Sequence, residues 1–518
     1  MKEVIKKTLA GCLTLMTFCF YAQTSKNKQF ASKPNVIFIY ADDLGYGDLS
    51  CYGATKIITP NLDKLANNGI RFSNAHCTSA TCTPSRYALL TGEYPWKKEG
   101  TGILPGDAAL IIPTNKTTLP KLFQQAGYKT ANVGKWHLGL GDQVAKNWNT
   151  EIKPSPNEVG FDYSFIFPAT ADRVPTVFLE NHKVLALDPN DPIEVSYETK
   201  VGNDPTGKEH PELLKMKSSP NHGHDNTIVN GIGRIGYMSG GTKARWVDEE
   251  LSSTFLEKAK EFIEDNQKKP FFLYFALTEP HVPRMPATMF RGKSSLGYRG
   301  DAILQLDWTV GQIMKQLESL GISKNTMIIF TSDNGAVLDD GYQDGAVTEL
   351  NGHTPNGILR GGKYSVLEAG TRVPFIINWP DAVKPKVSSA MVCQMDLLAS
   401  FSNLLGQSIP KNDAPDSKNT LDAFLGKSDK GRAVLIEQGG NASGKGGTLA
   451  IVKDNWKFIP PNDGILIQPL VNIETGNSKE PQLYNLNEDM REKNNLAQKF
   501  PEKVKELSIL FENETHKK

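Results

Sequence analysis

Apolar runs of strand length recur along the chain and predict the main elements of the fold. The segments 35–41, 271–276 and 326–331 are almost continuously apolar or β-branched. Runs of this kind are typical of strands buried on both faces, as in a parallel sheet. Between the first two, Val247, Leu251, Phe255 and Ala259 recur at four-residue steps and predict an amphipathic helix. Alternation of buried strands with such helices favours an open α/β fold.

The rest of the chain divides into three further regions. Residues 147–241 are rich in Pro, Asn, Asp and Gly with weak periodicity, which predicts long loops. A helix predicted over 394–405 closes the large domain. From about residue 431 the pattern changes to short strands, followed by an amphipathic helix over 502–512. We therefore predict a signal peptide at 1–22, a catalytic domain at 33–425 and a C-terminal subdomain at 426–518.

The first residues have the pattern of an export signal. Lysines at the start are followed by the apolar stretch 9–20 and an exit at Tyr21-Ala22-Gln23. This pattern predicts a secretory signal peptide, and hence a periplasmic or secreted protein. Cys12 lies in a lipoprotein-like box, but the apolar run follows Cys12, so lipidation ranks second. No later stretch is long enough to span a bilayer.

Composition narrows the classes of partner. The 518 residues carry a formal net charge of +1, which gives no reason to propose nucleic acid or an anionic membrane as a partner. Hydrophobic residues make up 39% of the chain, enough for a large core. Once the signal has been removed, the cysteines are too few for a disulfide scaffold. Cys51 and Cys77 could pair in an oxidising compartment, and the sequence leaves this open.

Acidic side chains follow two of the predicted strands. Asp42 and Asp43 come directly after the first, and Asp333 and Asn334 after the third. Because ligands of open α/β sheets bind beyond the carboxyl ends of strands, these four side chains could meet there. An all-oxygen set suits Ca²⁺ first and Mg²⁺ second, and it disfavours zinc, which prefers histidine and cysteine ligands. The alternative is a pair of solvated surface turns.

The string Cys82-Thr83-Pro84-Ser85-Arg86 places a cysteine at or just before a predicted helix N-terminus. Free N–H groups and the helix dipole favour an anion there, and Arg86 adds a fixed planar charge. The setting suits a phosphate or sulfate group. A single cysteine is otherwise more often a buried thiol or half of a disulfide.

Other basic residues stand in segments that could reach the same ligand. Lys135 and His137 are two apart on a predicted extended segment, and His281 lies between two prolines. Lys363 follows two glycines, which let the backbone come close to a ligand. In the long loops, the candidates for holding a charged or sugar substrate are Arg173, His222 and His224. Bonding to local backbone is an equally good interpretation for each of these three.

Taken together, these strings resemble the formylglycine-dependent (type I) sulfatases of the alkaline phosphatase superfamily. The shared strings are Cys82 to Arg86 with Leu90-Thr91-Gly92, the second signature over 127–139, Asp42-Asp43, Ser332 to Gly335, Pro280 to Pro283, Gly361-Gly362-Lys363, Leu483 to Leu486 and Asn495-Leu496-Ala497. The resemblance covers nearly the whole mature chain. It implies an α/β fold with a large mixed sheet flanked by helices, and a smaller C-terminal α+β domain.

The resemblance also implies roles for individual residues. Cys82 would be oxidised to formylglycine (3-oxoalanine) by a formylglycine-generating or sulfatase-maturing enzyme. Asp42, Asp43, Asp333 and Asn334 would bind calcium together with the modified Cys82. Arg86 would stabilise the hydrated aldehyde, whereas Lys135, His281 and Lys363 would hold the sulfate ester. His137 would help to break down the covalent intermediate, and Thr170 could supply an additional hydroxyl. Glu368-Ala369-Gly370 replaces the Glu-Gly-Gly of many relatives.

The predicted activity is hydrolysis of a sulfate ester on a sulfated carbohydrate. In the hydrated aldehyde, one hydroxyl attacks sulfur and the other expels sulfate as the aldehyde re-forms. Two alternatives remain: a phosphodiester or phosphonate monoester hydrolase that uses the same aldehyde, and a catalytically inactive glycan-binding protein. The sugar, the sulfate position and the oligomeric state are beyond the sequence.

Overall fold

A mixed β-sheet forms the centre of the fold. The computed structural model describes residues 33–144, 146–440 and 447–516, so the predicted signal peptide and Cys12 lie outside the described residues. Within these ranges the main sheet has ten strands. Their order across the sheet is β15 (Lys386–Ser388), β2 (Ile70–Phe72), β14 (Phe375–Asn378), β13 (Thr326–Ser332), β1 (Asn35–Ala41), β12 (Phe271–Ala276), β4 (Lys129–Lys135), β5 (Tyr163–Phe167), β6 (Leu179–Glu180) and β7 (Lys183–Val184).

The centre of this sheet is parallel and its flanks contain antiparallel pairs. β1 pairs in parallel with both β13 and β12, and β12 pairs in parallel with β4. On the flanks, β13 pairs antiparallel with β14, and β5 with β6. The three predicted strands are confirmed as β1, β12 and β13, and the predicted large mixed sheet is confirmed.

Helices cover both faces of the sheet. Ile37 and Ile39 of β1 belong to a core shared with residues of α1 (Pro60–Asn67), α5 (Leu251–Asn266) and α6 (Gly297–Ser319). On the opposite face, Phe272 stacks on Phe123 of α3 (Leu119–Gln125) at 4.2 Å between ring centroids, and Phe123 contacts Phe401 of α8 (Leu397–Leu405). Burial on both faces explains the continuous apolar runs. The helices are α1 (Pro60–Asn67), α2 (Cys82–Thr91), α3 (Leu119–Gln125), α4 (Pro156–Val159), α5 (Leu251–Asn266), α6 (Gly297–Ser319), α7 (Glu368–Thr371), α8 (Leu397–Leu405), α9 (Leu421–Phe424) and α10 (Pro501–Thr515).

Two local predictions are wrong. Residues 147–241 were expected to be loops, yet β5, β6 and β7 lie there and extend the main sheet. Val247 was expected on the amphipathic helix, but the helix begins at Leu251 and Val247 is exposed. The remaining strands of this region are β8 (Glu194–Ser196), β9 (Ile228–Val229), β10 (Ile232–Gly233) and β11 (Tyr237–Ser239). Short 3-10 helices occupy Ser50–Tyr52, Pro95–Lys97, Pro211–Leu213, Thr242–Ala244, Asp248–Glu250, Thr288–Phe290 and Gln394–Asp396.

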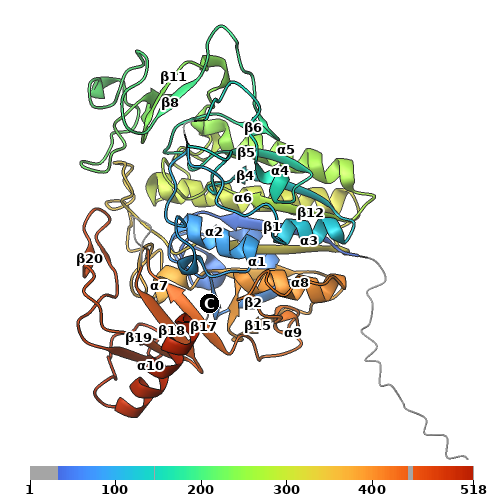
Figure 1. The fold of residues 1–518 in the computed structure, drawn as a ribbon, viewed down its shortest axis with the longest axis vertical. Helices are drawn as coiled ribbons and strands as arrows, with labels where there is room; N and C mark the ends of the chain where they lie inside the picture. The colour runs from blue at the N-terminus through green and yellow to red at the C-terminus, as the bar shows by residue number, and fades with distance from the viewer. Residues whose placement is uncertain (1–32, 145, 441–446, 517–518) are drawn as a thin grey trace, which may run out of the picture. The chain divides into compact units, whose positions relative to one another are not determined.

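A second, antiparallel sheet follows in the last hundred residues, with α10 packed against it (Figure 1). Its order is β17 (Val434–Gln438), β18 (Leu449–Lys453), β19 (Trp456–Ile459) and β22 (Gln482–Asn485). The hairpin β20 (Ile467–Gln468) and β21 (Ile473–Glu474) and the pair β3 (Ala75–His76) and β16 (Val392–Cys393) are separate. The C-terminal α+β arrangement is confirmed, while the boundary at 425/426 stays a prediction.

The possible disulfide does not form. Cys51, Cys77, Cys82 and Cys393 are free thiols. Cys77 is buried, and its sulfur donates to the backbone oxygens of Ser79 and Thr371.

Candidate active site

The predicted site residues meet where four adjacent parallel strands end. β13, β1, β12 and β4 are neighbours in this order. Ala41 is opposite Ser332 in the register, so the acids that follow β1 and the pair that follows β13 emerge together. Lys135 is the last residue of β4, and His281 follows β12. The strand ends therefore determine the place of the site.

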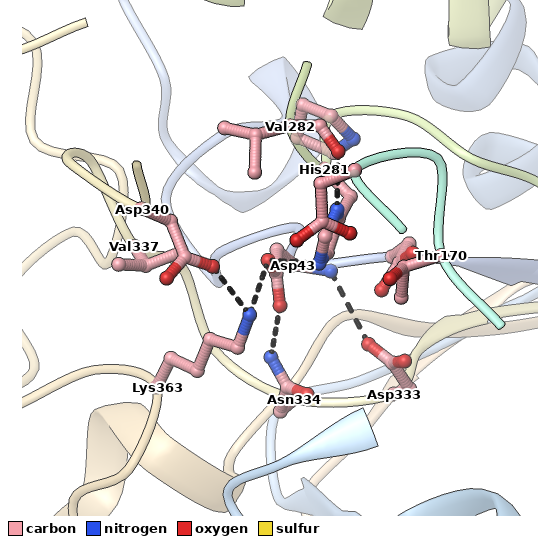
Figure 2. Close-up of polar contacts among 12 residues, drawn as sticks. Asp43, Thr170, His281, Val282, Asp333, Asn334, Val337, Asp340 and Lys363 are labelled. Carbon is pink, nitrogen blue, oxygen red and sulfur yellow. Dashed lines mark hydrogen bonds and ion pairs between the residues drawn. The ribbon is translucent and has the colours of Figure 1, made fainter. Parts of the chain in front are cut away.

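Buried ion pairs hold the acids and the bases against each other. Lys135 Nζ lies 2.6 Å from Asp42 Oδ2, and Lys363 Nζ lies 2.9 Å from Asp43 Oδ2. Arg86 donates from Nε and Nη2 to Asp333 Oδ2, at 3.0 and 2.8 Å. Figure 2 shows Asp43 between Lys363, Asn334 and His281. These acids therefore lie in a buried site and not in solvated turns.

The donor set fits a hard cation. Within the described residues, Asp42 Oδ1 and Asn334 Oδ1 are buried without a hydrogen-bond partner. Burial and the charge of Asp333 raise the pKa of Asp42 well above its ordinary value despite Lys135. Ligand atoms of Asp42, Asp43 and His281 all lie within 4.8 Å of one another. A cation among these oxygens would offset their mutual repulsion and satisfy the two orphaned acceptors.

Cys82 occupies the first position of α2, as predicted. Its side chain is buried, and burial raises the pKa of the thiol. The encoded cysteine is therefore a protonated thiol and a weak nucleophile as it stands. Thr83, the next residue, donates from Oγ1 to the carbonyl of His137 at 3.1 Å, which ties the start of α2 to the end of β4.

The two histidines of the site are fixed by backbone carbonyls. His137 Nε2 donates to the Leu104 carbonyl at 2.9 Å, and His281 Nδ1 donates to the Val282 carbonyl at 2.7 Å. Burial and the charge of Lys135 lower the pKa of both rings well below the usual value. His137 is therefore a neutral imidazole, and its buried Nδ1 has no partner among the described residues. Such a nitrogen is a proton acceptor.

The loop candidates share a cavity with three of the catalytic candidates, whereas Arg86, Lys135 and His137 are not among its lining residues. A cavity of about 220 Å³ is lined by Cys82, Arg173, His222, His224, His281 and Lys363, among others. Thr170 is buried and is not a lining residue, but its Oγ1 accepts a hydrogen bond from Nη1 of the lining residue Arg173 at 2.6 Å. His224 Nε2 lies 3.0 Å from Asp172 Oδ2. These residues are therefore placed to meet a substrate, although they also contact their neighbours.

Sequence reasoning missed several residues of this cavity. Asp172, Asp340 and Tyr364 line it, as do Gln468, Leu470 and Val471 from the β20–β21 hairpin. Asp340 Oδ2 accepts a hydrogen bond from Lys363 Nζ at 2.7 Å. An acidic residue seven positions beyond Asp333 in a loop carries no periodic signal, so the sequence offered no means to select it.

Two glycines allow the Lys363 loop to approach the strand end. A Cβ on Gly335 would stand 1.6 Å from the Ala369 carbonyl oxygen, and one on Gly362 would stand 2.6 Å from the Ala336 carbonyl oxygen. Lys363 N then donates to the Ala336 carbonyl at 3.1 Å. Close packing of these backbones brings the lysine to Asp43.

A larger cavity, of about 840 Å³, is lined by residues of α1, α6 and the β13–β14 region and contains none of the predicted site residues. Among the described residues, no helix is both long and apolar enough to cross a membrane.

Comparison with known proteins identifies the family. A sequence model of the sulfatase family matches residues 34–407. The chain is 54% identical over 501 residues to an N-acetylgalactosamine-6-O-sulfatase of Bacteroides thetaiotaomicron, with 97% of both sequences covered. The chain belongs to the sulfatase family. It is a sulfuric ester hydrolase, and its resemblance to type I sulfatases is confirmed.

Other relatives agree with this assignment. Human steryl-sulfatase is 31% identical to this sulfatase over 425 residues, which cover 77% of this chain and 71% of the relative. A solved sulfatase from work on the metabolism of multiple glycosaminoglycans by B. thetaiotaomicron matches with a TM-score of 0.91 at 54% identity, covering 94% of this chain and 100% of the other. A Pseudoalteromonas sulfatase matches with a TM-score of 0.68 at 25% identity, covering 94% and 91%. The alkaline-phosphatase-like fold is thereby confirmed.

Proposed function

We propose that this sulfatase removes 6-O-sulfate from N-acetylgalactosamine units of sulfated glycosaminoglycans. The observation that carries the chemistry is the single cavity that contains Cys82, His281 and Lys363 beside the strand-end acids. The sugar class is supported by the 54% identity to an N-acetylgalactosamine-6-O-sulfatase over almost the full chain. Export to the periplasm or the medium, supported by the pattern of residues 1–22, would give access to such polymers.

The nucleophile and the metal are part of the same proposal. Formylglycine made from Cys82 would supply one hydroxyl to attack sulfur and a second through which sulfate is released. Asp42, Asp43, Asp333 and Asn334 would hold Ca²⁺, with Mg²⁺ as the runner-up, next to residue 82. The orphaned oxygens of Asp42 and Asn334 support this assignment.

The chain's own residues would act on the substrate as follows. The Lys363 ammonium has three donors, and two are used by Asp43 and Asp340, so the third is left for a sulfate or leaving-group oxygen. Lys135 and His281 would neutralise charge on the same ester. Arg86, held by Asp333, would orient the hydroxyls of residue 82. His137 would accept a proton at its unpartnered Nδ1 as sulfate is released.

The first test is the mass of the peptide that contains Cys82, from protein produced together with a maturation enzyme. Conversion to the aldehyde lowers the mass by about 18 Da, and we expect the modified protein alone to release sulfate. The wild type should act on 6-O-sulfated N-acetylgalactosamine, and Cys82→Ala should be inactive. Modified protein that releases no sulfate from any sulfated sugar would contradict the proposal.

Substrate panels separate the alternatives. Activity on 4-O-sulfated N-acetylgalactosamine tests which sulfate position is hydrolysed. Activity on 6-O-sulfated N-acetylglucosamine tests whether the enzyme distinguishes the configuration at C4 of the sugar. Matched aryl sulfate and aryl phosphate esters test whether sulfur or phosphorus is preferred. Faster turnover of the phosphodiester or phosphonate would favour the other hydrolase activity. Binding of sulfated glycan without turnover by fully modified protein would indicate a glycan-binding role.

A further inference from the structure

Among the described residues that line the cavity, Asp340 is the one acid whose carboxylate is only partly used by the protein. Asp172, the other acid that lines the cavity, accepts hydrogen bonds from Arg173 at 3.1 Å and lies 3.0 Å from His224. Asp340 uses Oδ2 for Lys363, whereas its Oδ1 lies 3.5 Å from the Tyr364 hydroxyl, at the outer limit of a hydrogen bond. The Asp340 side chain is 14% exposed, compared with 4% for Asp172.

The charge of Asp340 is maintained by its neighbour. Burial opposes ionisation, but the Lys363 ammonium outweighs it and lowers the pKa of Asp340 below its ordinary value. An ionised carboxylate only accepts hydrogen bonds. In Figure 2, Asp340 and Asp43 lie on either side of the Lys363 ammonium. The Lys363 ammonium therefore lies between Asp43 at the strand end and Asp340 at the cavity wall.

We propose that Asp340 is a specificity-determining residue, which accepts a hydrogen bond from a ring hydroxyl of the sugar while Lys363 holds the ester. This inference rests on the proposed sulfatase activity on a sugar. The Asp340 carboxylate and the sulfate ester are both negatively charged, so the carboxylate does not bind the ester itself. A neutral hydrogen-bond donor beside the ester can bind to it, and a sugar hydroxyl is such a donor. The contact would fix how the ring is turned once its sulfate is bound.

A purely supporting role for Asp340 is excluded if the effect of its replacement depends on the leaving group. A residue that merely aims Lys363 would influence every sulfate ester equally. A residue that binds a sugar hydroxyl would influence only esters that carry that hydroxyl. An aryl sulfate has the same reacting group and no hydroxyl, so it separates the two roles.

The experiment compares wild type, Asp340→Asn and Asp340→Ala, with Asp339→Asn as a matched control. Asp339 is the adjacent acid, accepts from Ser219 Oγ at 2.9 Å and is not a lining residue of the cavity. We expect kcat/KM on the sulfated sugar to fall about 10- to 100-fold in both Asp340 variants, the size of a lost charge-assisted hydrogen bond. Activity on aryl sulfate should fall by a clearly smaller factor, because that ester loses only the contact between Asp340 and Lys363 and has no hydroxyl contact to lose. Asp339→Asn should match wild type on both substrates.

A second set of substrates identifies the hydroxyl. Monodeoxy analogues of the sulfated sugar are assayed with wild type and with Asp340→Ala. We expect one analogue to be poor for wild type, and the same analogue to be hydrolysed by Asp340→Ala as fast as the parent sugar, because the partner is already missing. The inference would be overturned if each deoxy analogue lowered kcat/KM by the same factor in wild type and in Asp340→Ala.

The outcomes are distinguishable. Equal losses on sugar and aryl sulfate, or no loss on the sugar, would overturn the role of Asp340 and leave the sulfatase proposal intact. Wild type that hydrolyses aryl sulfate but no sulfated sugar would overturn both the proposed substrate class and the inference. Retained aryl sulfatase activity in the Asp340 variants shows that they are folded and modified.

Discussion

Lys457 should be one of the most costly residues to replace in the C-terminal subdomain. Its ammonium lies 3.0 Å from Glu368, 2.8 Å from Glu437 and 3.3 Å from Glu492, and all four side chains are fully buried. Glu368 belongs to α7, directly after the Lys363 loop, so this contact joins the second sheet to the catalytic domain. Lys457→Met keeps most of the side-chain volume and removes the charge.

The size of the effect follows from burial. At an effective dielectric constant of about 20, a pair of opposite charges 3 Å apart attracts by ~5 kcal/mol, before desolvation of the ammonium is subtracted. Removing one partner of a buried ion pair typically costs about 3–5 kcal/mol, because the remaining charges stay buried and unpaired. Glu368 retains Arg372 as a partner, and Glu437 retains His76, which limits the loss to this range.

The assay is urea unfolding followed by tryptophan fluorescence, with Lys453→Met as the control. Lys453 pairs with Glu506 at 2.9 Å on the surface, where the two side chains are 34% and 42% exposed. Exposed pairs contribute little, so we expect Lys457→Met to lower the free energy of unfolding by ~3–5 kcal/mol and Lys453→Met to change it hardly at all. Adding Glu437→Gln to Lys457→Met should recover part of the loss. Similar stabilities of the two lysine variants would refute this reasoning.

Three further predictions concern pH, packing and the metal. Burial raises the pKa of Glu492 to about 8 despite Lys457, whereas a glutamate in the unfolded chain has a pKa of ~4.3. Between these two pH values the folded protein keeps a proton that the unfolded chain has lost, so the free energy of unfolding should fall as pH rises. Melting temperatures at pH 5 to 8 should show a gain for Glu492→Gln that grows with pH, and parallel curves for the two proteins would contradict the assignment. Gly335→Ala should lower both the melting temperature and sulfate release, because its Cβ would stand 1.6 Å from the Ala369 carbonyl oxygen. Gly207→Ala should cost clearly less, because its Cβ would stand 3.2 Å from the nearest atom, the Asp225 Cα, and needs only a small shift. Chelation by EDTA should reduce sulfate release and the melting temperature, and Ca²⁺ should restore both better than Mg²⁺; unchanged values after chelation would argue against a bound cation.

Local sequence patterns were sufficient for the elements that carry the chemistry. A strand with apolar side chains on both faces is buried, and its backbone N–H and C=O groups can then form hydrogen bonds only with neighbouring strands. The apolar run at 326–331 therefore predicted a central strand of a sheet. Side chains directly after such strands, such as Asp42 and Asp333, are placed by the strands themselves. The helix that starts at Cys82 was equally predictable, since Pro84 and Ser85 favour its first turn.

Only the tertiary structure decided the contacts made by loops. Asp340 and Asp172 lie in loops whose sequences show no regular pattern of apolar and polar residues. Their contacts with Lys363 and with His224 depend on how distant segments pack. The same holds for the β20–β21 hairpin, which brings Leu470 to the cavity from a position almost 400 residues after Cys82. Strand β5 was missed because it is short and surrounded by Pro, Asn and Gly.

The sequence by itself therefore determined the candidate reacting centre of this sulfatase, because its residues are tied to the ends of regular elements whose geometry is local. The tertiary structure alone decided the walls of the substrate cavity and the buried charges around Lys457, because these depend on long-range packing between segments that carry no shared pattern. The physical reason is that hydrogen bonding within a strand or helix is set by neighbours in sequence, whereas the partner of a buried charge is set by the whole fold.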